Sequence, residues 1–220
     1  MGVFKKGING PFSGKTGSII GSKWKSIHYM KGLPRVRAHR KASAEQLVQR
    51  QKFKLLLDFF TPMQQLLKIG FQQFLNRNTA INAAMKFNYD QALYEEEGEI
   101  RLDYSKVQLS HGALFTAGAE KAVLLPEGLK ITWNTKTYGI SGNMDDRVFV
   151  ACYIQLEDWV SADSVLREDG EIFMELSEKE MQSILHVWIF LSNAQGGQAS
   201  KTVYIPIERE NEPIDNLKNG

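Results

Sequence analysis

Hydrophobic and polar residues alternate roughly from Thr16 to Met30, which is the pattern of short β-strands. We expect either a hairpin or two short edge strands at 16–21 and 23–30. In the second strand, alternation predicts one face made of Trp24, Ser26, His28 and Met30, and an opposite face made of Lys23, Lys25, Ile27 and Tyr29. Gly32-Leu33-Pro34 ends this β-structure, and residues 35–41 continue as an exposed basic connector.

From Ser43 to Leu93 the apolar residues recur at helical spacing. Ser43 and Gln46 predict a capping box at the start of a first helix. We expect a second helix to begin at Thr61-Pro62 and to carry an apolar stripe from 63 to 75, and a third helix to begin after Thr79 and run towards 93. The short connections favour an antiparallel helical hairpin or small bundle.

Beyond the acidic turn at 95–98 the pattern becomes that of β-strands. We expect strands at 102–109, 114–125, 128–133, 147–156, 171–176, 184–191 and 201–207, with a hairpin loop at 193–197. About seven short strands with turns every ~8–12 residues favour an antiparallel β-sandwich, and the alternation of Leu129, Ile131 and Trp133 is typical of a fibronectin type III or immunoglobulin-like module.

The predicted fold class is therefore α+β, in four parts. A basic glycine-rich N-terminal β-hairpin arm occupies 1–42, and a helical hairpin or bundle occupies 43–97. A C-terminal antiparallel β-sandwich occupies 98–208, and a polar, mobile tail occupies 209–220.

Charge is distributed very unevenly along the chain. The net charge of the 220 residues is only +2, but ten of the 27 basic residues and none of the 25 acidic residues lie in 1–42. The rest of the chain consequently carries a net charge of −8. Because the arm has too few apolar side chains to bury a core, we expect it to contact phosphate, an acidic surface of a neighbour, or the acidic part of its own chain.

The arm also contains the candidate binding residues. Lysines next to aromatic rings offer charges for phosphates and flat surfaces for stacking, and glycines let a partner approach the backbone closely. The candidate residues for binding nucleic acid or a protein partner are Lys15, Lys23, Trp24, Lys25, Tyr29, Lys31, Arg35, Arg37, Arg40 and Lys41. A basic arm that inserts into a neighbouring subunit, or a solvated hairpin docked on its own body, would have the same composition.

The sequence does not indicate an enzyme. Gly14-Lys15-Thr16 resembles the end of a P-loop, but Gly10 and Gly14 enclose three residues instead of the four that the loop requires. The four histidines have no metal-ligand spacing, and Asp145-Asp146 is better explained as a turn before a strand. We expect no catalytic residues, metal, cofactor or small-molecule substrate.

The single cysteine, Cys152, lies in an apolar run and is expected to be a buried free thiol, which excludes an intrachain disulfide and an antibody-type domain. The sequence contains neither a signal-peptide pattern nor an apolar run long enough to span a membrane. A cytoplasmic or virion-associated location without membrane contact is expected.

The N-terminal motif resembles that of an uncharacterised family found chiefly in Bacteroidota, whose members begin with GxxSGKxGxxxGxxWKG and continue with a Q-x-x-QR-x-KF helix. The matching residues are Gly10, Ser13, Gly14, Lys15, Gly17, Gly21, Trp24, Lys25, Leu33, Pro34, Gln46, Gln49, Arg50, Lys52 and Phe53, and Ser26 replaces a glycine. The likeness covers nearly the whole chain, including an immunoglobulin-like C-terminal half, and it implies no activity. A weaker likeness to phage proteins implies a structural or virion-associated role.

The expected function is that of a non-enzymatic structural or adaptor protein of a larger, phage-like assembly. In this hypothesis the basic arm docks on an acidic protein partner, on another copy, or on nucleic acid. The alternative is a nucleic-acid-binding protein with salt-dependent, largely sequence-independent binding.

Overall fold

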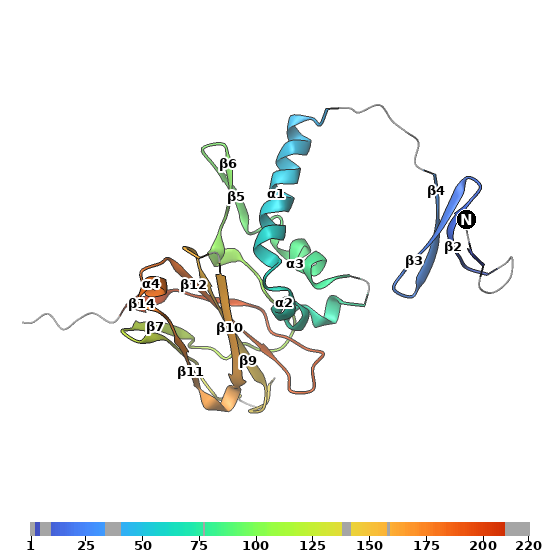
Figure 1. Cartoon of the computed structure of the whole chain (residues 1–220). Coiled ribbons are helices and arrows are strands. Elements are labelled where there is room, and N and C mark those ends of the chain that lie inside the picture. Colours follow the sequence, from blue (N-terminus) through green and yellow to red (C-terminus); the bar gives the residue numbers. More distant parts are fainter. Residues whose placement is uncertain are drawn as a thin grey trace, which may run out of the picture. The chain divides into compact units, whose positions relative to one another are not determined.

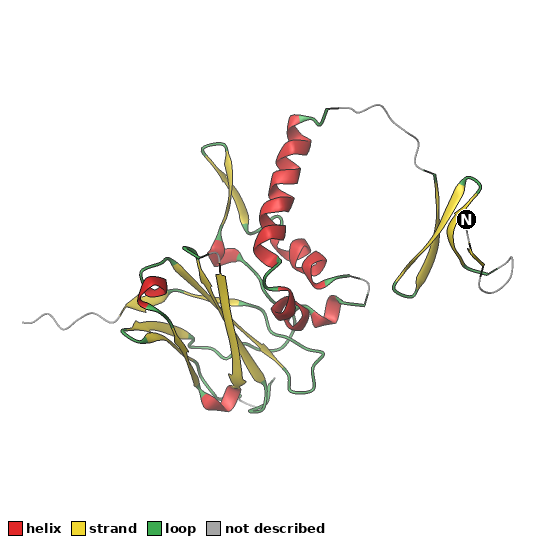
Figure 2. Ribbon diagram, in the orientation of Figure 1, coloured by secondary structure: helices red, strands yellow, loops and turns green. Residues whose placement is uncertain are grey.

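The computed structural model describes residues 3–4, 10–33, 41–76, 78–137, 142–157 and 159–209. The chain divides into two compact units, Met1–Gln46 and Leu47–Gly220. Its helices and strands make it a mixed α+β protein, as the sequence predicts (Figures 1 and 2).

The first unit contains an antiparallel sheet with the strand order β1-β2-β3-β4. Its strands are β1 (Val3–Phe4), β2 (Phe12–Thr16), β3 (Ile19–Trp24) and β4 (Ile27–Gly32). Two-residue loops, 17–18 and 25–26, join β2 to β3 and β3 to β4. The predicted strand boundaries were therefore wrong, because each predicted strand contains a turn. Gly17 and Lys25 make these turns with φ values of 60° and 51°.

The predicted faces of 23–30 were also wrong. Trp24 pairs with Ile27 across the loop, and Ser22 pairs with Tyr29. Cross-strand partners share a face, so Trp24 lies on the side of Ile27 and Tyr29 and not on the side of Met30. The prediction treated 23–30 as one strand, whereas the loop at 25–26 shifts the alternation by one residue.

Gly21 allows β2 and β3 to approach closely. A Cβ atom at this position would lie 2.3 Å from the carbonyl oxygen of Phe12 and 2.7 Å from the Phe12 ring. Gly32, at the end of β4, has open space where its Cβ would stand. The glycine at 21 is therefore a packing requirement of this sheet.

The helices of the second unit are α1 (Ala44–Phe60, which begins in the first unit), α2 (Gln64–Gly70), the 3₁₀-helix η1 (Gln72–Phe74) and α3 (Ala80–Asn88). The predicted capping box of α1 is confirmed, because the backbone N–H of Ser43 donates to the Gln46 side chain and that of Gln46 donates to Ser43 Oγ. Thr79 Oγ1 likewise accepts from the Asn82 N–H and caps α3.

Three predicted helix boundaries were wrong. The second helix, α2, ends at Gly70 and not near 75, and the 3₁₀-helix η1 follows it. Thr61 does not cap α2, because its hydroxyl donates to the carbonyl oxygen of Leu57 in the last turn of α1. The third helix ends at Asn88 instead of near Leu93. Asn88 is buried, and its side-chain amide donates to the carbonyl oxygens of Ala84 and Gln108 while accepting from the Gln108 N–H. These bonds tie the end of α3 to the following loop.

A small antiparallel hairpin follows the helices. Its strands are β5 (Leu93–Glu96) and β6 (Glu99–Leu102), and the 3₁₀-helix η2 (Tyr104–Lys106) comes next. The strand predicted at 102–109 was therefore wrong beyond 102. Asp103 ends the strand by accepting hydrogen bonds from the N–H and hydroxyl of Ser105, and these bonds lower the pKa of its carboxyl group.

Two four-stranded sheets complete the second unit. One has the order β11-β8-β7-β14 and the other the order β10-β9-β12-β13. The strands of the first sheet are β7 (Lys121–Leu125), β8 (Gly128–Thr132), β11 (Glu171–Glu175) and β14 (Ile207–Arg209). The strands of the second sheet are β9 (Arg147–Ile154), β10 (Trp159–Leu166), β12 (Leu185–Ser192) and β13 (Val203–Ile205). The 3₁₀-helix η3 (Arg167–Asp169) and α4 (Glu178–Met181) lie in the connections.

The β9–β12 sheet is buried on both faces. One face shares a core with β7, β8 and β11, formed around Val150, Ile189 and Ile131. The other face packs against α1, α2 and α3 through Ala151, Tyr153 and further residues, including Trp188 and Phe190 (Figure 1). Burial on both faces explains why β9 is a nearly continuous apolar run.

A buried ion pair joins the start of β9 to η3. Arg167 is 2% exposed and Asp146 is 0% exposed, and Arg167 Nη1 lies 3.8 Å from Asp146 Oδ2. The same carboxylate oxygen accepts a 2.7 Å hydrogen bond from the Asn143 N–H, and the Arg167 carbonyl accepts from Trp133 Nε1. Asp146, considered above as part of a turn, is therefore a buried structural residue.

We expect Asp146→Asn to lower the free energy of unfolding by about 3–5 kcal/mol, because it leaves the Arg167 charge buried without its counter-ion. Urea unfolding of the full chain measures this. Glu171→Gln is the control, since Glu171 and Lys130 form an exposed 2.8 Å pair whose loss should cost less than about 1 kcal/mol. Equal losses for the two variants would contradict the assigned role.

We expect Gly21→Ala to loosen the N-terminal sheet, because its new methyl group collides with the backbone of Phe12. Hydrogen exchange measured by mass spectrometry should show amides of 12–32 exchanging about tenfold faster, with those of 147–154 unchanged. Gly32→Ala, which meets open space, should leave both segments unchanged. Unaltered exchange at 12–32 in the first variant would be the contrary result.

Candidate functional site

Most of the predicted binding residues gather in the N-terminal sheet. Those in its strands and loops are Lys15, Lys23, Trp24, Lys25, Tyr29 and Lys31. Lys41 is exposed in the segment before α1. Arg35, Arg37 and Arg40 lie outside the described residues.

One face of this sheet combines large apolar side chains with lysines. Register and alternation bring together the residues that we call the aromatic face, namely Lys15, Ile20, Ser22, Trp24, Ile27, Tyr29 and Lys31. The exposed fractions of Trp24, Ile27 and Tyr29 are 49%, 52% and 44%. Contiguous exposed apolar side chains of this size are typical of an interaction surface.

The remaining strand lysine lies on the opposite face. Lys23 pairs with His28 there, and Met30 is 67% exposed beside them. The cations of the described strands are thus divided between the two faces. Lys15 and Lys31 share a face with the aromatic rings, and both pair with Ile20 on the central strand β3.

Lys25 occupies a conformationally costly position at the tip of the β3–β4 hairpin. Its φ of 51° is in the left-handed region, where an L-residue with a long side chain costs roughly 1–2 kcal/mol. Glycine or asparagine would adopt this turn at lower cost. Lys25 therefore places a positive charge at the tip of the hairpin.

The aromatic face can cover an apolar partner surface while its lysines contact acidic groups at the margin. Tyr and Trp are well suited to this because they bury a large area and lose few rotamers. Sequence reasoning missed the contribution of Ile20 and Ile27 to this face. Trp24 and Ile27 are separated by two residues, Lys25 and Ser26, which is the length of a tight hairpin loop. This spacing was the signal that could have identified them.

The histidines and the cysteine of the body are held by packing. His111 stacks on Phe87 with ring centroids 4.2 Å apart, and burial lowers its pKa. His186 stacks on Tyr104 and hydrogen bonds to the Tyr204 hydroxyl, and burial also lowers its pKa. Cys152 is a buried free thiol, as predicted, and burial raises its pKa to about 12.

Within the part of the chain that the structure describes, no group of three or more His, Cys, Asp or Glu side chains is placed to hold a metal ion. None of the helices formed by the described residues has the length and apolar character needed to cross a membrane.

Comparison with known proteins gives a family but no activity. No curated protein matches the chain. Residues 11–206 match the model of a family described as a family of unknown function, DUF6266. This match includes β2, β3 and β4 of the N-terminal sheet, the helices, and every strand of the body except β14. Because the match extends over most of its length, this chain belongs to the DUF6266 family.

Proposed function

We propose that this protein is a non-enzymatic structural or adaptor component of a larger assembly, and that its N-terminal sheet docks on an acidic protein surface. The observation that carries the proposal is the aromatic face, where exposed Trp24, Ile27 and Tyr29 lie beside Lys15 and Lys31. Residues 1–42 contain no acidic side chain that could neutralise these lysines within the sheet.

The small size of the sheet supports docking. A sheet of short strands with one exposed apolar face gains little stability by itself, so a partner that covers the face would stabilise it. Its outer strands also have unpaired backbone groups, which a neighbouring chain can pair with. A docked sheet would therefore be ordered by the contact that it makes.

An acidic protein surface fits the aromatic face better than nucleic acid does. A groove that follows a nucleic-acid backbone needs a row of cations, but Lys23 lies on the opposite face from Lys15 and Lys31. Ile20 and Ile27 add aliphatic area, which suits an apolar protein surface. Residues 43–220 carry 17 basic and 25 acidic residues, so another copy of the chain offers an acidic surface and would repel phosphates.

We further propose that the two facing sheets form a fibronectin type III or immunoglobulin-like sandwich that acts as a spacer. Among the seven strands from β7 to β13, β7, β8 and β11 belong to one sheet and β9, β10, β12 and β13 belong to the other. In chain order, the first sheet therefore holds the first, second and fifth strands, and the other sheet holds the third, fourth, sixth and seventh. This division supports the fibronectin type III arrangement, because in constant immunoglobulin domains the fourth strand joins the first sheet instead. In a phage-like particle, such a spacer could hold neighbouring components apart while the N-terminal sheet docks on one of them.

The proposal predicts salt-sensitive self-association of the full chain that depends on the aromatic face. Sedimentation velocity should detect oligomers at about 50 mM salt that dissociate at about 500 mM. Trp24→Ser combined with Tyr29→Ser should weaken association about 30-fold or more, as expected for central aromatic residues. Phe115→Ser is the matched control, because Phe115 is exposed to a similar degree but lies in the body.

A mobility shift with random DNA and RNA tests the alternative. A steep loss of nucleic-acid affinity with salt, weakened further by Lys23→Ala and Lys25→Ala, would overturn the protein-docking proposal in favour of nucleic-acid binding. A chain that remains monomeric at low salt would also overturn it.

A further inference from the structure

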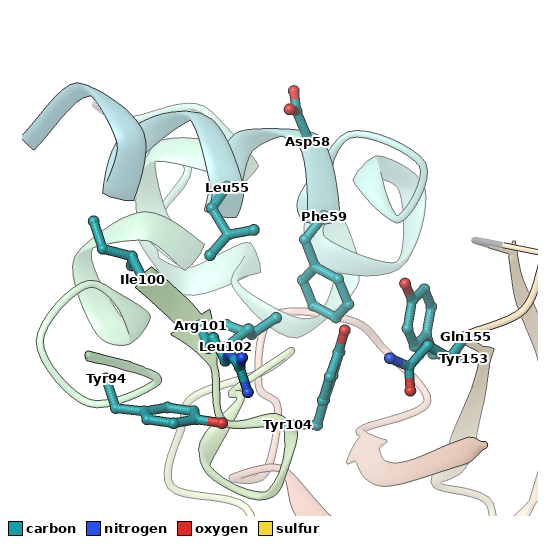
Figure 3. A pocket seen from close by; sticks show the side chains of 10 residues that line it. All are labelled: Leu55, Asp58, Phe59, Tyr94, Ile100, Arg101, Leu102, Tyr104, Tyr153 and Gln155. Atoms are coloured by element: carbon teal, nitrogen blue, oxygen red, sulfur yellow. The ribbon is translucent and has the colours of Figure 1, made fainter. Parts of the chain in front are cut away.

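A cleft lies between α1 and the β5–β6 hairpin, within the second unit. Its volume is about 450 Å³, and Leu55 and Phe59 of α1, Ile100 of β6, Tyr104 and Tyr153 are among the residues that line it (Figure 3). A second hollow of about 420 Å³ shares Leu55, Asp58 and Ile100 with it and extends to Gly98 at the hairpin loop. We call the two hollows together the α1 cleft.

The inner part of the α1 cleft is aromatic. Phe59 makes edge-to-face contacts with Tyr104 and Tyr153, at centroid distances of 5.8 and 5.4 Å. Figure 3 shows these three rings close together, with Leu55 and Ile100 on one side of them. Val48, two helical turns before Leu55, is exposed and extends the apolar surface along α1. Phe59 and Tyr153 are themselves buried, so Leu55, Ile100, Tyr104 and Val48 provide most of the apolar surface that could cover tryptophan, isoleucine or tyrosine side chains.

The rim of the α1 cleft carries both signs of charge, because Asp58, Glu99, Lys54 and Arg101 all line it. The acidic residues of the adjoining hairpin tip make this end of the cleft more acidic than basic. Asp58 lies at this rim, and its carboxylate points away from the rings in Figure 3. Glu99 lines the cleft, and Glu95, Glu96 and Glu97 are exposed beside it in the same hairpin. Arg101 is the cation of this hairpin, and it is paired with Glu96 at 2.5 Å and with Glu99 at 3.7 Å. By contrast, the hollows next to Lys106 and next to Arg209 have no carboxylate among their lining residues.

The tip of this hairpin repeats, with the opposite charge, the feature seen at Lys25. Glu97 and Gly98 form the two-residue loop with φ values of 53° and 82°, so Glu97 is another long charged residue in the left-handed region. Asparagine or glycine would make this turn at lower cost. One hairpin thus has a cation at its tip and the other an anion, so the two tips are complementary in charge.

From this complementarity we propose that the α1 cleft accepts the β3–β4 hairpin from the N-terminal sheet of a second copy of the chain. The aromatic face covers the apolar part of the cleft, and Lys25 lies against the acidic tip at Glu97. This inference rests on the proposed function and identifies its acidic partner surface. Because the proposed contact joins two different surfaces, the β3–β4 hairpin of one copy and the α1 cleft of another, it is head-to-tail and can extend or close a chain of copies.

A charge exchange tests the contact in the full chain. Lys25→Glu and Glu97→Lys should each weaken self-association about tenfold or more at low salt, because each places like charges together. Glu127→Lys is the matched control for the second variant, since it makes the same change of charge in the exposed β7–β8 turn, and it should change association by less than about twofold. Thermal unfolding of each variant verifies that the body is intact.

Mixing the two variants identifies the chain that supplies the hairpin. In an equimolar mixture of Lys25→Glu and Glu97→Lys chains, every contact between unlike chains pairs opposite charges, so association should return to within about threefold of the unmodified level. Docking of the hairpin on its own chain predicts no recovery on mixing, and that result would overturn the inference.

The two proposals can fail separately. If the Trp24 and Tyr29 substitutions dissolve the oligomer but Glu97→Lys behaves like Glu127→Lys, the cleft assignment is wrong and the docking function stands. If the Trp24 and Tyr29 substitutions have no effect on association, the docking function itself is wrong and the cleft assignment is overturned with it.

Discussion

The organisation of the body depends on the burial of one sheet from both sides. Along β9, Val148, Val150 and Cys152 point into the core shared with the second sheet, and Ala151 and Tyr153 point towards the helices. Neither face can be exposed to water without leaving a wide apolar surface uncovered. The helices and the second sheet are therefore parts of one compact unit. The α1 cleft lies on the helical side of this sheet, and its aromatic residues belong to the helical core.

The regular parts of this arrangement could be predicted from the sequence. The helix after Ser43 and the strands around Ile131, Val150 and Ile189 have clear periodicity, and the structure contains them. The strand β10 was missed, because Ser161, Asp163 and Ser164 give it a polar composition that resembles a loop. Its place comes from pairing along the whole of β9, which is a tertiary interaction that local pattern does not reveal.

The candidate site was predictable in composition but not in geometry. Clustering of lysine with Trp24 and Tyr29 is visible in the sequence, but assigning faces requires the position of the turn. That turn uses Lys25 at positive φ, where a glycine or asparagine would have signalled it. The acidic hairpin differs, because Gly98 follows Glu97 and the sequence predicted a turn at 95–98. Only at Lys25 does a charged residue at positive φ hide the turn in the sequence.

The last strands of the body have a mechanical consequence. At Pro206 the chain passes from β13, in one sheet, to β14, which pairs in parallel with β7 of the other sheet. In a parallel pair, a force that pulls the end of β14 away from the start of β7 acts along both strands. It loads all of their shared hydrogen bonds at the same time, so these bonds do not break one after another. The body should therefore resist a force that pulls the end of β14 away from the start of β7.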